Sequence, residues 1–397
     1  MLYGKTIVLG VSGGIAAYKA VELLRLLTKA RAEVHVVMTK NAREFVTPLT
    51  FQTLSHHPVH TEMFDLNQEQ EIGHISLADR ADLFLVAPAT ANLIGKLANG
   101  LADDLLSTSL MATKAPVLLC PAMNTNMYEN VHYQRNHRLL VADGYHLLEP
   151  ISGDLACGWQ GAGKLPDPQQ IFAEACRLLA PADLTGVRLL ITAGPTREEL
   201  DPVRYLSNYS SGKMGYAIAR VAAARGAAVT LISGPVALSA PAGVKTLQVT
   251  SALEMQSVLN ENYAEVDVVI MAAAVADYRP AHKAEQKIKK NTSEFSLSLE
   301  RNPDLLAELG QRKTGQILVG FAAETENLVA NATTKLKNKN LDLIVANDIT
   351  AEGAGFGSET NLVKLLFADG RQEELPLLSK DEVAAQLLNR IVLLLKK

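Results

Sequence analysis

The stretch TIVLGVSGGIAAYKAVELLRLLTK, residues 6–29, decides the fold expected for this chain. Thr6–Val11 is a short apolar run of the kind found in a buried strand. Ala16–Lys29 repeats its apolar residues at helical spacing, and the glycines between the two runs permit a sharp turn. Because strand-like and helical runs alternate along the rest of the chain, we predict βαβ units and a mostly parallel sheet.

The alternating pattern restarts near residue 184, which predicts two domains. The strands expected in the first part are Thr6–Val11, Glu33–Thr39, Leu83–Ala87, Pro116–Pro121 and Tyr145–Leu148. Those expected in the second part are Val187–Thr192, Ala228–Ser233, Lys245–Val249, Val266–Ala272, Gln316–Gly320 and Asp342–Ala346, followed by a hairpin of Asn361–Phe367 and Gln372–Leu375. The fold class is therefore α/β, with a flavodoxin-like or Rossmann-like parallel sheet in residues 1–183 and a Rossmann-like α/β domain in residues 184–397.

Composition narrows the class of protein. Hydrophobic residues make up 48% of the 397 residues and charged residues 20%, which excludes a disordered chain. A net charge of −4 gives no general attraction to nucleic acid or to an anionic membrane. No apolar run is long enough to span a bilayer, and three scattered cysteines argue against a disulfide framework. We expect a soluble, cytoplasmic protein whose N-terminal segment is a strand and turn and not a signal peptide.

Small and polar residues follow the expected strands, where an open α/β sheet binds its ligands. Ser12-Gly13-Gly14 leads into a helix and suits a phosphate; since the GxGxxG pattern is missing, a mononucleotide such as FMN fits better than a dinucleotide. A plain strand-to-helix turn explains this motif about as well. Asn124 follows another strand and either holds a substrate carboxylate or amide or caps a helix.

Two residues of the first domain are candidates for proton transfer. His74 heads a short helical segment and is either a general base or a capping or exposed histidine. Cys157 lies in a glycine-rich segment, Ser152–Asp167, that resembles a mobile lid, so its thiol is a candidate proton donor or nucleophile. The other two cysteines, Cys120 and Cys176, lie in apolar surroundings and are expected in the core.

A histidine-rich segment also raises the question of a metal. His56, His57 and His60 lie close together, with Glu62 as the nearby candidate for a fourth ligand. Their spacing matches no familiar zinc pattern, so we interpret the segment as loop or surface.

The second domain offers a candidate phosphate site. Ser210–Lys213 supplies hydroxyls, glycine and lysine at the start of an expected helix, although the P-loop spacing is missing and a polar loop without ligand is the alternative. Asp277 lies at the tip of an expected strand. The basic runs 287–290 and 335–339 are solvated faces by default, but both follow strand ends on the ligand side, which favours contact with a triphosphate.

Taken together, the motifs of the first part resemble the homo-oligomeric flavin-containing cysteine decarboxylases. The motifs are SGGIAAYK from Ser12, Gly73-His74-Ile75, PATAN from Pro88, PAMNTNM from Pro121 and the Cys157 segment. The resemblance implies an FMN site formed by Ser12, Gly13, Gly14, Thr39, Pro88, Ala89, Thr90, Ala91 and Asn92. It also implies that His74 assists oxidation of the thiol-bearing carbon, that Asn124 holds the carboxylate and that Cys157 protonates the enethiol.

Over its whole length the chain resembles the bacterial bifunctional proteins that join such a decarboxylase to a phosphopantothenate–cysteine ligase. The segments that carry this likeness are TAGPTREELDPVRYLSN from Thr192, SSGKMG from Ser210, AAAVADY from Ala272, KIKK from Lys287, RNPDLL from Arg301 and GFAAET from Gly320. The implied ligase uses CTP to convert 4′-phosphopantothenate into an acyl-cytidylate, and the amine of L-cysteine then displaces CMP. The implied product is decarboxylated to 4′-phosphopantetheine.

The resemblance also implies residue roles in the ligase. Asn208 contacts the acyl intermediate and Lys287 offsets charge in the transition state. The residues implied to border CTP are Ala272, Ala273, Asp277, Lys287, Pro303, Asp304, Leu305, Leu306, Phe321, Lys335 and Lys339. Mg²⁺ is expected to be held mainly by the CTP phosphates. The family further implies a homo-oligomer, a dodecamer of decarboxylase trimers with ligase domains paired as dimers.

Two other functions are compatible with parts of the sequence. One is a decarboxylase that acts on a peptide cysteine and carries a degenerate second domain; the presence of Asn208, Asp277 and Lys287 argues against it. The other is a flavin-binding regulatory or scaffold protein, against which the presence of Cys157, His74 and Asn124 argues.

Overall fold

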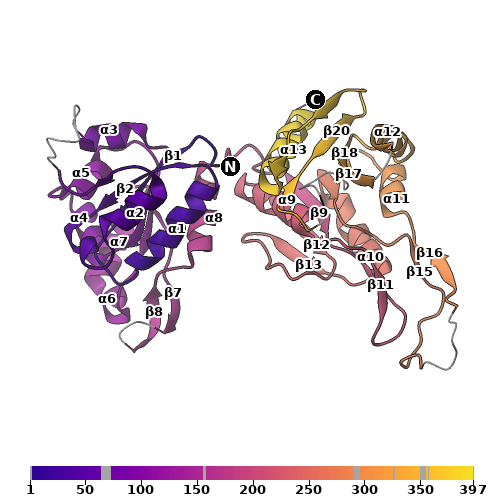
Figure 1. The fold of residues 1–397 in the computed structure, drawn as a ribbon, viewed down its shortest axis with the longest axis horizontal. Coiled ribbons are helices and arrows are strands. Elements are labelled where there is room, and N and C mark those ends of the chain that lie inside the picture. The colour runs from indigo at the N-terminus through magenta and orange to yellow at the C-terminus, as the bar shows by residue number, and fades with distance from the viewer. Residues whose placement is uncertain are drawn as a thin grey trace. The chain divides into compact units, whose positions relative to one another are not determined.

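The chain forms two compact units in the computed structural model, Met1–Ala180 and Pro181–Lys397, and each is described by itself. The structure describes residues 2–63, 73–154, 158–289, 296–324, 327–348, 355 and 357–396. Figure 1 shows that each unit is a sheet covered by helices.

The first unit is built on a parallel sheet, which among the described residues has the strand order β3-β2-β1-β4-β5-β6. The strands are β1 (Thr6–Val11), β2 (Glu33–Met38), β3 (Val59–His60), β4 (Leu83–Ala89), β5 (Val117–Pro121) and β6 (His146–Leu147). The chain moves outward from β1 in one direction and then returns to β4 on the other side of β1. The crevice at the carboxyl ends of β1 and β4 is therefore the place where this topology binds ligands.

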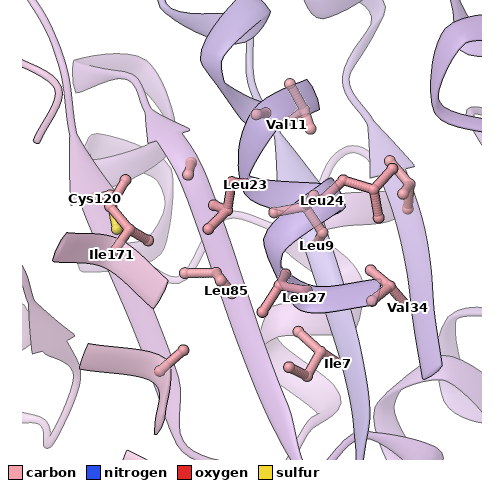
Figure 2. Packing of buried hydrophobic residues seen from close by; sticks show 14 of the residues in the cluster. Ile7, Leu9, Val11, Leu23, Leu24, Leu27, Val34, Leu85, Cys120 and Ile171 are labelled. Atoms are coloured by element: carbon pink, nitrogen blue, oxygen red, sulfur yellow. The ribbon is translucent and has the colours of Figure 1, made fainter. Parts of the chain in front are cut away.

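Helices cover both faces of this sheet. They are α1 (Ala17–Lys29), η1 (Lys40–Glu44), α2 (Pro48–Ser55), α3 (Gly73–Arg80), α4 (Ala91–Ala98), α5 (Leu105–Ala112), α6 (Thr125–Glu129), α7 (Val131–Ala142) and α8 (Pro168–Leu179). Figure 2 shows Leu23 and Leu27 of α1 packed against Leu9 and Leu85 of the sheet, beside Ile171 of α8. The neighbouring strand residues face the opposite helices, which explains why these strands are apolar throughout.

The glycine-rich segment after β6 differs from the expected loop. Ile151–Asp154 (β7) and Gln160–Lys164 (β8) pair as an antiparallel hairpin. Gly163 has a φ of +132°, and a Cβ at this position would lie 2.2 Å from the carbonyl oxygen of Met123. The glycines therefore permit a strand to pack closely against another segment, a role that composition alone does not distinguish from loop flexibility.

The second unit repeats the same arrangement and extends it. Among the described residues its main sheet has the order β13-β12-β9-β14-β17-β18-β20-β21, in which β20 and β21 are antiparallel additions. The strands are β9 (Arg188–Ala193), β12 (Ala228–Ser233), β13 (Lys245–Gln248), β14 (Val268–Met271), β17 (Ile317–Glu324), β18 (Leu343–Asp348), β20 (Val363–Phe367) and β21 (Gln372–Glu374). The equivalent ligand crevice lies at the carboxyl ends of β9 and β14.

Helices and short strands complete the second unit. The helices are α9 (Lys213–Ala224), α10 (Ala252–Asn262), η2 (Tyr263–Glu265), α11 (Leu305–Gln311), α12 (Leu328–Asn338) and α13 (Lys380–Leu395). The short strands are β10 (Arg197–Glu199), β11 (Tyr205–Ser207), β15 (Tyr278–Pro280), β16 (Leu299–Arg301), β19 (Thr360–Asn361) and β22 (Leu378–Ser379). The predicted α/β class and the parallel sheets are confirmed. The polar stretch of residues 194–212 before α9 contains the β10–β11 hairpin, where the sequence analysis expected no strand.

Candidate active sites

Ser12 joins the carboxyl ends of β1 and β4 at the crevice of the first unit. Its buried hydroxyl donates a hydrogen bond to the carbonyl oxygen of Pro88 at 2.7 Å and accepts one from the backbone N–H of Thr90 at 3.0 Å. The Thr90 hydroxyl lies 3.2 Å from the Ser12 hydroxyl oxygen and caps the N-terminus of α4. Two of the expected cofactor segments are therefore fixed to each other by one side chain.

The adjacent loop fits a phosphate group. A Cβ on Gly13 would lie 2.3 Å from Cβ of Asn41, so only glycine lets the loop pass at this point. The Thr39 hydroxyl is buried and has no hydrogen-bond partner among the described residues. Among the described residues, no side chain caps the N-terminus of α1, so its first N–H groups lack a side-chain acceptor. A helix N-terminus and a spare hydroxyl donor are the groups that a phosphate accepts hydrogen bonds from.

Asn124 has the capping contact that the sequence analysis left open. Its Oδ1 accepts a hydrogen bond from the backbone N–H of Asn126 at 2.9 Å, at the start of α6. The β7–β8 hairpin packs against this segment, because the N–H of Met123 donates to the carbonyl oxygen of Gly163 at 2.9 Å. The cap fixes the orientation of Asn124; a contact with a substrate carboxylate stays a prediction.

The side chains of two expected catalytic residues of the first unit are not described by the structure. His74 belongs to the first turn of α3, but its side chain is not among those described. Cys157 falls between β7 and β8, in the segment 155–157. The roles given to both stay predictions. Cys120 and Cys176 are buried, as expected, and burial raises the pKa of the Cys120 thiol.

The second unit has a cavity of about 810 Å³ at the carboxyl ends of its central strands. Its walls come from the segment after β14, the N-terminus of α9, the start of α11 and one side of α12. The lining includes every residue expected to border CTP except Lys287, namely Ala272, Ala273, Asp277, Pro303, Asp304, Leu305, Leu306, Phe321, Lys335 and Lys339. Segments more than 60 residues apart in sequence therefore form one wall.

Positive charge dominates this cavity. Among the described lining residues the cationic side chains are Lys213, Arg301, Lys335, Lys339 and Lys380. The carboxylates of the lining are Asp277 and Asp304, and Lys339 forms an ion pair with Asp304 at 2.9 Å. Burial lowers the pKa of the Lys380 ammonium, and nearby Lys213 lowers it further. A cavity with this surplus of cations suits a ligand with several negative charges.

Asn208 ties the long polar stretch to the tip of β14. Its Nδ2 donates hydrogen bonds to the carbonyl oxygens of Ala274 at 3.1 Å and Val275 at 3.3 Å. Both of these residues line the cavity. Thr196 also holds this segment: its hydroxyl accepts a hydrogen bond from the N–H of Ala276 at 3.0 Å. Asn208 itself is exposed and lies at the rim, beside the lining residues.

Lys287 is exposed and is not part of the cavity lining. Its neighbour Ile288 is held by Asp201, whose buried carboxylate accepts the Ile288 N–H at 3.1 Å. Asp201 also binds the Arg204 guanidinium at 2.5 Å. This ion pair, together with the backbone N–H groups that donate to the carboxylate, holds the pKa of Asp201 well below its usual range. The expected role of Lys287 stays a prediction.

Sequence reasoning missed several residues of the cavity. The Nδ2 of Asn302 donates a hydrogen bond to the carbonyl oxygen of Ala276 at 2.8 Å. Its backbone N–H donates one to the carbonyl oxygen of Asp277 at 2.9 Å. The sequence could have indicated Asn302, because it directly precedes Pro303 in the RNPDLL segment. Lys380 lies at the start of α13, where a lysine carries no sign of ligand binding.

Comparison with known proteins agrees with this division into two units. The family described as Flavoprotein matches residues 1–180, and the family described as DNA/pantothenate metabolism flavoprotein C-terminal domain matches residues 184–394. The two matches define a flavoprotein with a second, distinct α/β domain. The chain belongs to the family of coenzyme A biosynthesis bifunctional proteins.

The similarity to these relatives extends over the whole chain. The coenzyme A biosynthesis bifunctional protein CoaBC of Bacillus subtilis (strain 168) is 50% identical, covering 100% of this chain and 99% of its own. That of Escherichia coli (strain K12) is 48% identical, covering 98% and 97%. A crystal structure of the C-terminal domain of such a protein is 48% identical, covers 54% of this chain and 98% of its own, and has a TM-score of 0.47. No helix among the described residues is long and apolar enough to cross a membrane.

Proposed function

We propose that this chain carries out two consecutive reactions of coenzyme A biosynthesis. The second unit ligates L-cysteine to 4′-phosphopantothenate with CTP, and the first unit decarboxylates the product to 4′-phosphopantetheine with FMN. Family membership supports the pair of activities. The observation that carries the ligase assignment is the cation-rich cavity lined by Lys335, Lys339 and Asp277.

The ligase reaction requires a carboxylate to become an electrophile. One oxygen of the 4′-phosphopantothenate carboxylate attacks the α-phosphorus of CTP, and pyrophosphate leaves. The amine of cysteine then attacks the acyl carbon, and CMP leaves with the electron pair of the bond that breaks. The cavity cations and Mg²⁺ held by the phosphates offset the charge of triphosphate and pyrophosphate, which lowers the barrier to the first step.

Residues at the β14 tip position the two reactants of this unit. Asn208 fixes the backbone at Ala274 and Val275, so the donors and acceptors of that segment keep one orientation. We assign Asn208 to the acyl intermediate, Asp277 to the nucleotide and Lys287 to the charge that develops on the phosphates. For Lys287 this requires the exposed segment around it to move to the cavity.

The first unit uses its crevice to hold the flavin. Ser12, Gly13, Gly14 and Thr39 fit the phosphate of FMN, and Pro88–Asn92 borders the rest. Bound there, FMN would supply a two-electron acceptor for oxidation of the thiol-bearing carbon, so that loss of CO₂ has an electron sink, and would supply the same electrons for the final reduction. Asn124 holds the substrate carboxylate, His74 accepts the proton of the oxidative step, and Cys157 donates the last proton.

Assembly and location follow from the family by analogy. We propose a homo-oligomer, a dodecamer of decarboxylase trimers with paired ligase domains, located in the cytoplasm. Molar mass from light scattering on the purified chain tests this assembly.

A coupled assay tests both activities. The purified chain is given 4′-phosphopantothenate, cysteine, CTP and Mg²⁺, and pyrophosphate and CO₂ are followed. The chain should release both, whereas Cys157→Ser should release pyrophosphate and fail to complete 4′-phosphopantetheine. Decarboxylation of a supplied thiol substrate without any pyrophosphate release would refute the ligase assignment.

A further inference from the structure

Three side chains with metal-binding groups meet at the amino end of β2, which is the opposite end of the sheet from the proposed FMN site. Glu33 and His35 alternate along the strand and therefore lie on the same face of the sheet. His35 Nε2 lies 3.0 Å from Oε1 of Glu33, and the ring centres of His35 and His57 are 4.6 Å apart. One donor atom from each of the three residues lies within 4.8 Å of the other two.

The turn between α2 and β3 holds His57 in this position before any ion binds. His56 ends α2 in the left-handed conformation, with φ of 61°, and its N–H donates to the carbonyl oxygen of Gln52. The Ser55 hydroxyl then donates to the carbonyl oxygen of His57 at 3.1 Å and accepts the His57 N–H at 3.2 Å. Because Ser55 is buried, the His57 backbone is attached to the body of the unit and not to a free loop.

We propose that Glu33, His35 and His57 bind a divalent transition-metal ion, Zn²⁺ being the best match, with water completing the coordination. Two imidazoles and one carboxylate are a donor set that Zn²⁺ accepts in proteins. Bonds of about 2 Å to a tetrahedral ion place the donor atoms roughly 3.3 Å apart, so small side-chain rotations close this set around the ion.

The surroundings favour an ion over a simple pair of histidines. His35 is buried and its ring centre lies 4.6 Å from that of His57, so packing fixes the position of one ligand beside the other. The carboxylate of Glu33 is 52% exposed, which leaves a path for an ion and its water to enter.

His56 and His57 lie in a turn, as the sequence analysis expected, whereas His60 belongs to β3. Glu62, the residue considered as a fourth ligand, instead forms an ion pair with Arg43 at 3.1 Å. The carboxylate beside the histidines comes from Glu33, 24 positions before His57. Sequence spacing missed this set because the strand β2 and the turn before β3 are brought together by parallel pairing, with Val36 opposite Val59.

The ion would fasten an otherwise weak edge of the sheet. Strand β3 is an edge strand of the sheet. Among the described residues it pairs with β2 through two residues only, Val59 and His60. A metal bound by β2 and by the turn before β3 links these two segments directly. Since the ion binds the folded arrangement, it should raise the melting temperature in proportion to the logarithm of its free concentration once the site is saturated.

Metal titration of the full-length chain with its flavin tests the proposal. Zn²⁺ binding is measured by competition with a chromogenic chelator, and Co²⁺ reports the ligands through its visible absorption. We expect one Zn²⁺ per chain with micromolar affinity, and a Co²⁺ spectrum without the near-ultraviolet band of a thiolate ligand. His57→Gln and Glu33→Gln should each weaken this binding about tenfold or more.

His132→Gln is the matched control, because His132 is exposed on α7, a helix that supplies no residue of the set. This variant should bind Zn²⁺ as the parent does. Flavin absorbance and the metal-free melting temperature show that each variant is folded, and Glu33→Gln changes only a half-exposed side chain. Zn²⁺ binding unchanged in both Glu33→Gln and His57→Gln, a thiolate band, or no Zn²⁺ binding by the parent at micromolar concentration would each overturn the proposal.

Discussion

The carboxylate of Asp201 accepts the backbone N–H of Ile288, and this contact joins two segments that lie 87 positions apart. One end of the contact belongs to the polar stretch that ends in Asn208. The other end is the residue after Lys287. Asp201 is buried, so it is a fixed point next to the exposed lysine.

Replacing this anchor should slow ligation. In Asp201→Asn the attraction to Arg204 is weakened and the segment around Lys287 is held less firmly, so we expect kcat of pyrophosphate release to fall about 10- to 100-fold. KM for CTP should change less, because the cavity cations remain. Glu199→Gln, in the same hairpin but paired at the surface with Lys283, is the control and should behave as the parent. An unchanged kcat in Asp201→Asn would contradict the positioning role.

The two faces of α12 should differ in their effect on CTP. Lys335 lines the cavity, whereas Lys337 is exposed and does not. Lys335→Gln removes one charged contact with the triphosphate, worth about 1.5 kcal/mol, and should raise KM for CTP roughly tenfold. Lys337→Gln should leave it unchanged. Equal effects of the two substitutions, measured at one ionic strength, would show that only overall charge matters.

The hairpin that carries Cys157 should depend on Gly163. A methyl group there meets the carbonyl oxygen of Met123 at 2.2 Å and requires an unfavourable φ, so Gly163→Ala should displace β8 from the Asn124 segment. We expect decarboxylation of the thiol substrate to fall at least tenfold while pyrophosphate release continues. Gly153→Ala in the partner strand, where the nearest atom is 3.5 Å away, should retain decarboxylation. Full activity of Gly163→Ala would contradict the requirement for close packing.

The second unit contains an ion pair whose effect on stability should depend on pH. Arg225 is 3% exposed and binds Asp183 through two hydrogen bonds, of 2.8 and 2.6 Å, which hold the pKa of Asp183 below its usual value. A lowered carboxyl pKa stabilises the folded state above the unfolded-state value near 4, and this stabilisation is lost as the pH falls through the folded-state pKa.

Asp183→Asn should therefore lower the free energy of unfolding by about 2 kcal/mol at pH 7, a value reduced because the carboxyl is one-third exposed. The difference from the parent should diminish as the pH is lowered below about 4. Urea unfolding of the two proteins at several pH values measures it. A difference that stays constant into this acid range would exclude the ion pair as its source.

The sequence was sufficient for the fold because buried parallel strands are apolar throughout. Thr6–Val11 and Ala228–Ser233 are strands with the predicted limits. Short or polar strands were missed: β3 has two residues, and β10 lies in a polar stretch. Their pairing comes from tertiary contacts, which periodicity does not record.

The candidate cavity was predicted through motif likeness more than through physical pattern. Asp277 stands at a strand tip, where topology alone favours a ligand contact. Lys380 could not be found in this way, because only the folded arrangement of α13 places it beside Lys213. The set of Glu33, His35 and His57 was hidden for the same reason.

The two edge strands of the sheet in the first unit influence how this unit can associate with other copies of the chain. Both edge strands, Val59–His60 and His146–Leu147, have two residues each. So short an edge offers few open N–H and C=O groups to a strand of another molecule. Among the described residues, pairing of this sheet's edges with a strand of another subunit is therefore disfavoured, and the covering helices offer more side-chain surface for contacts between subunits.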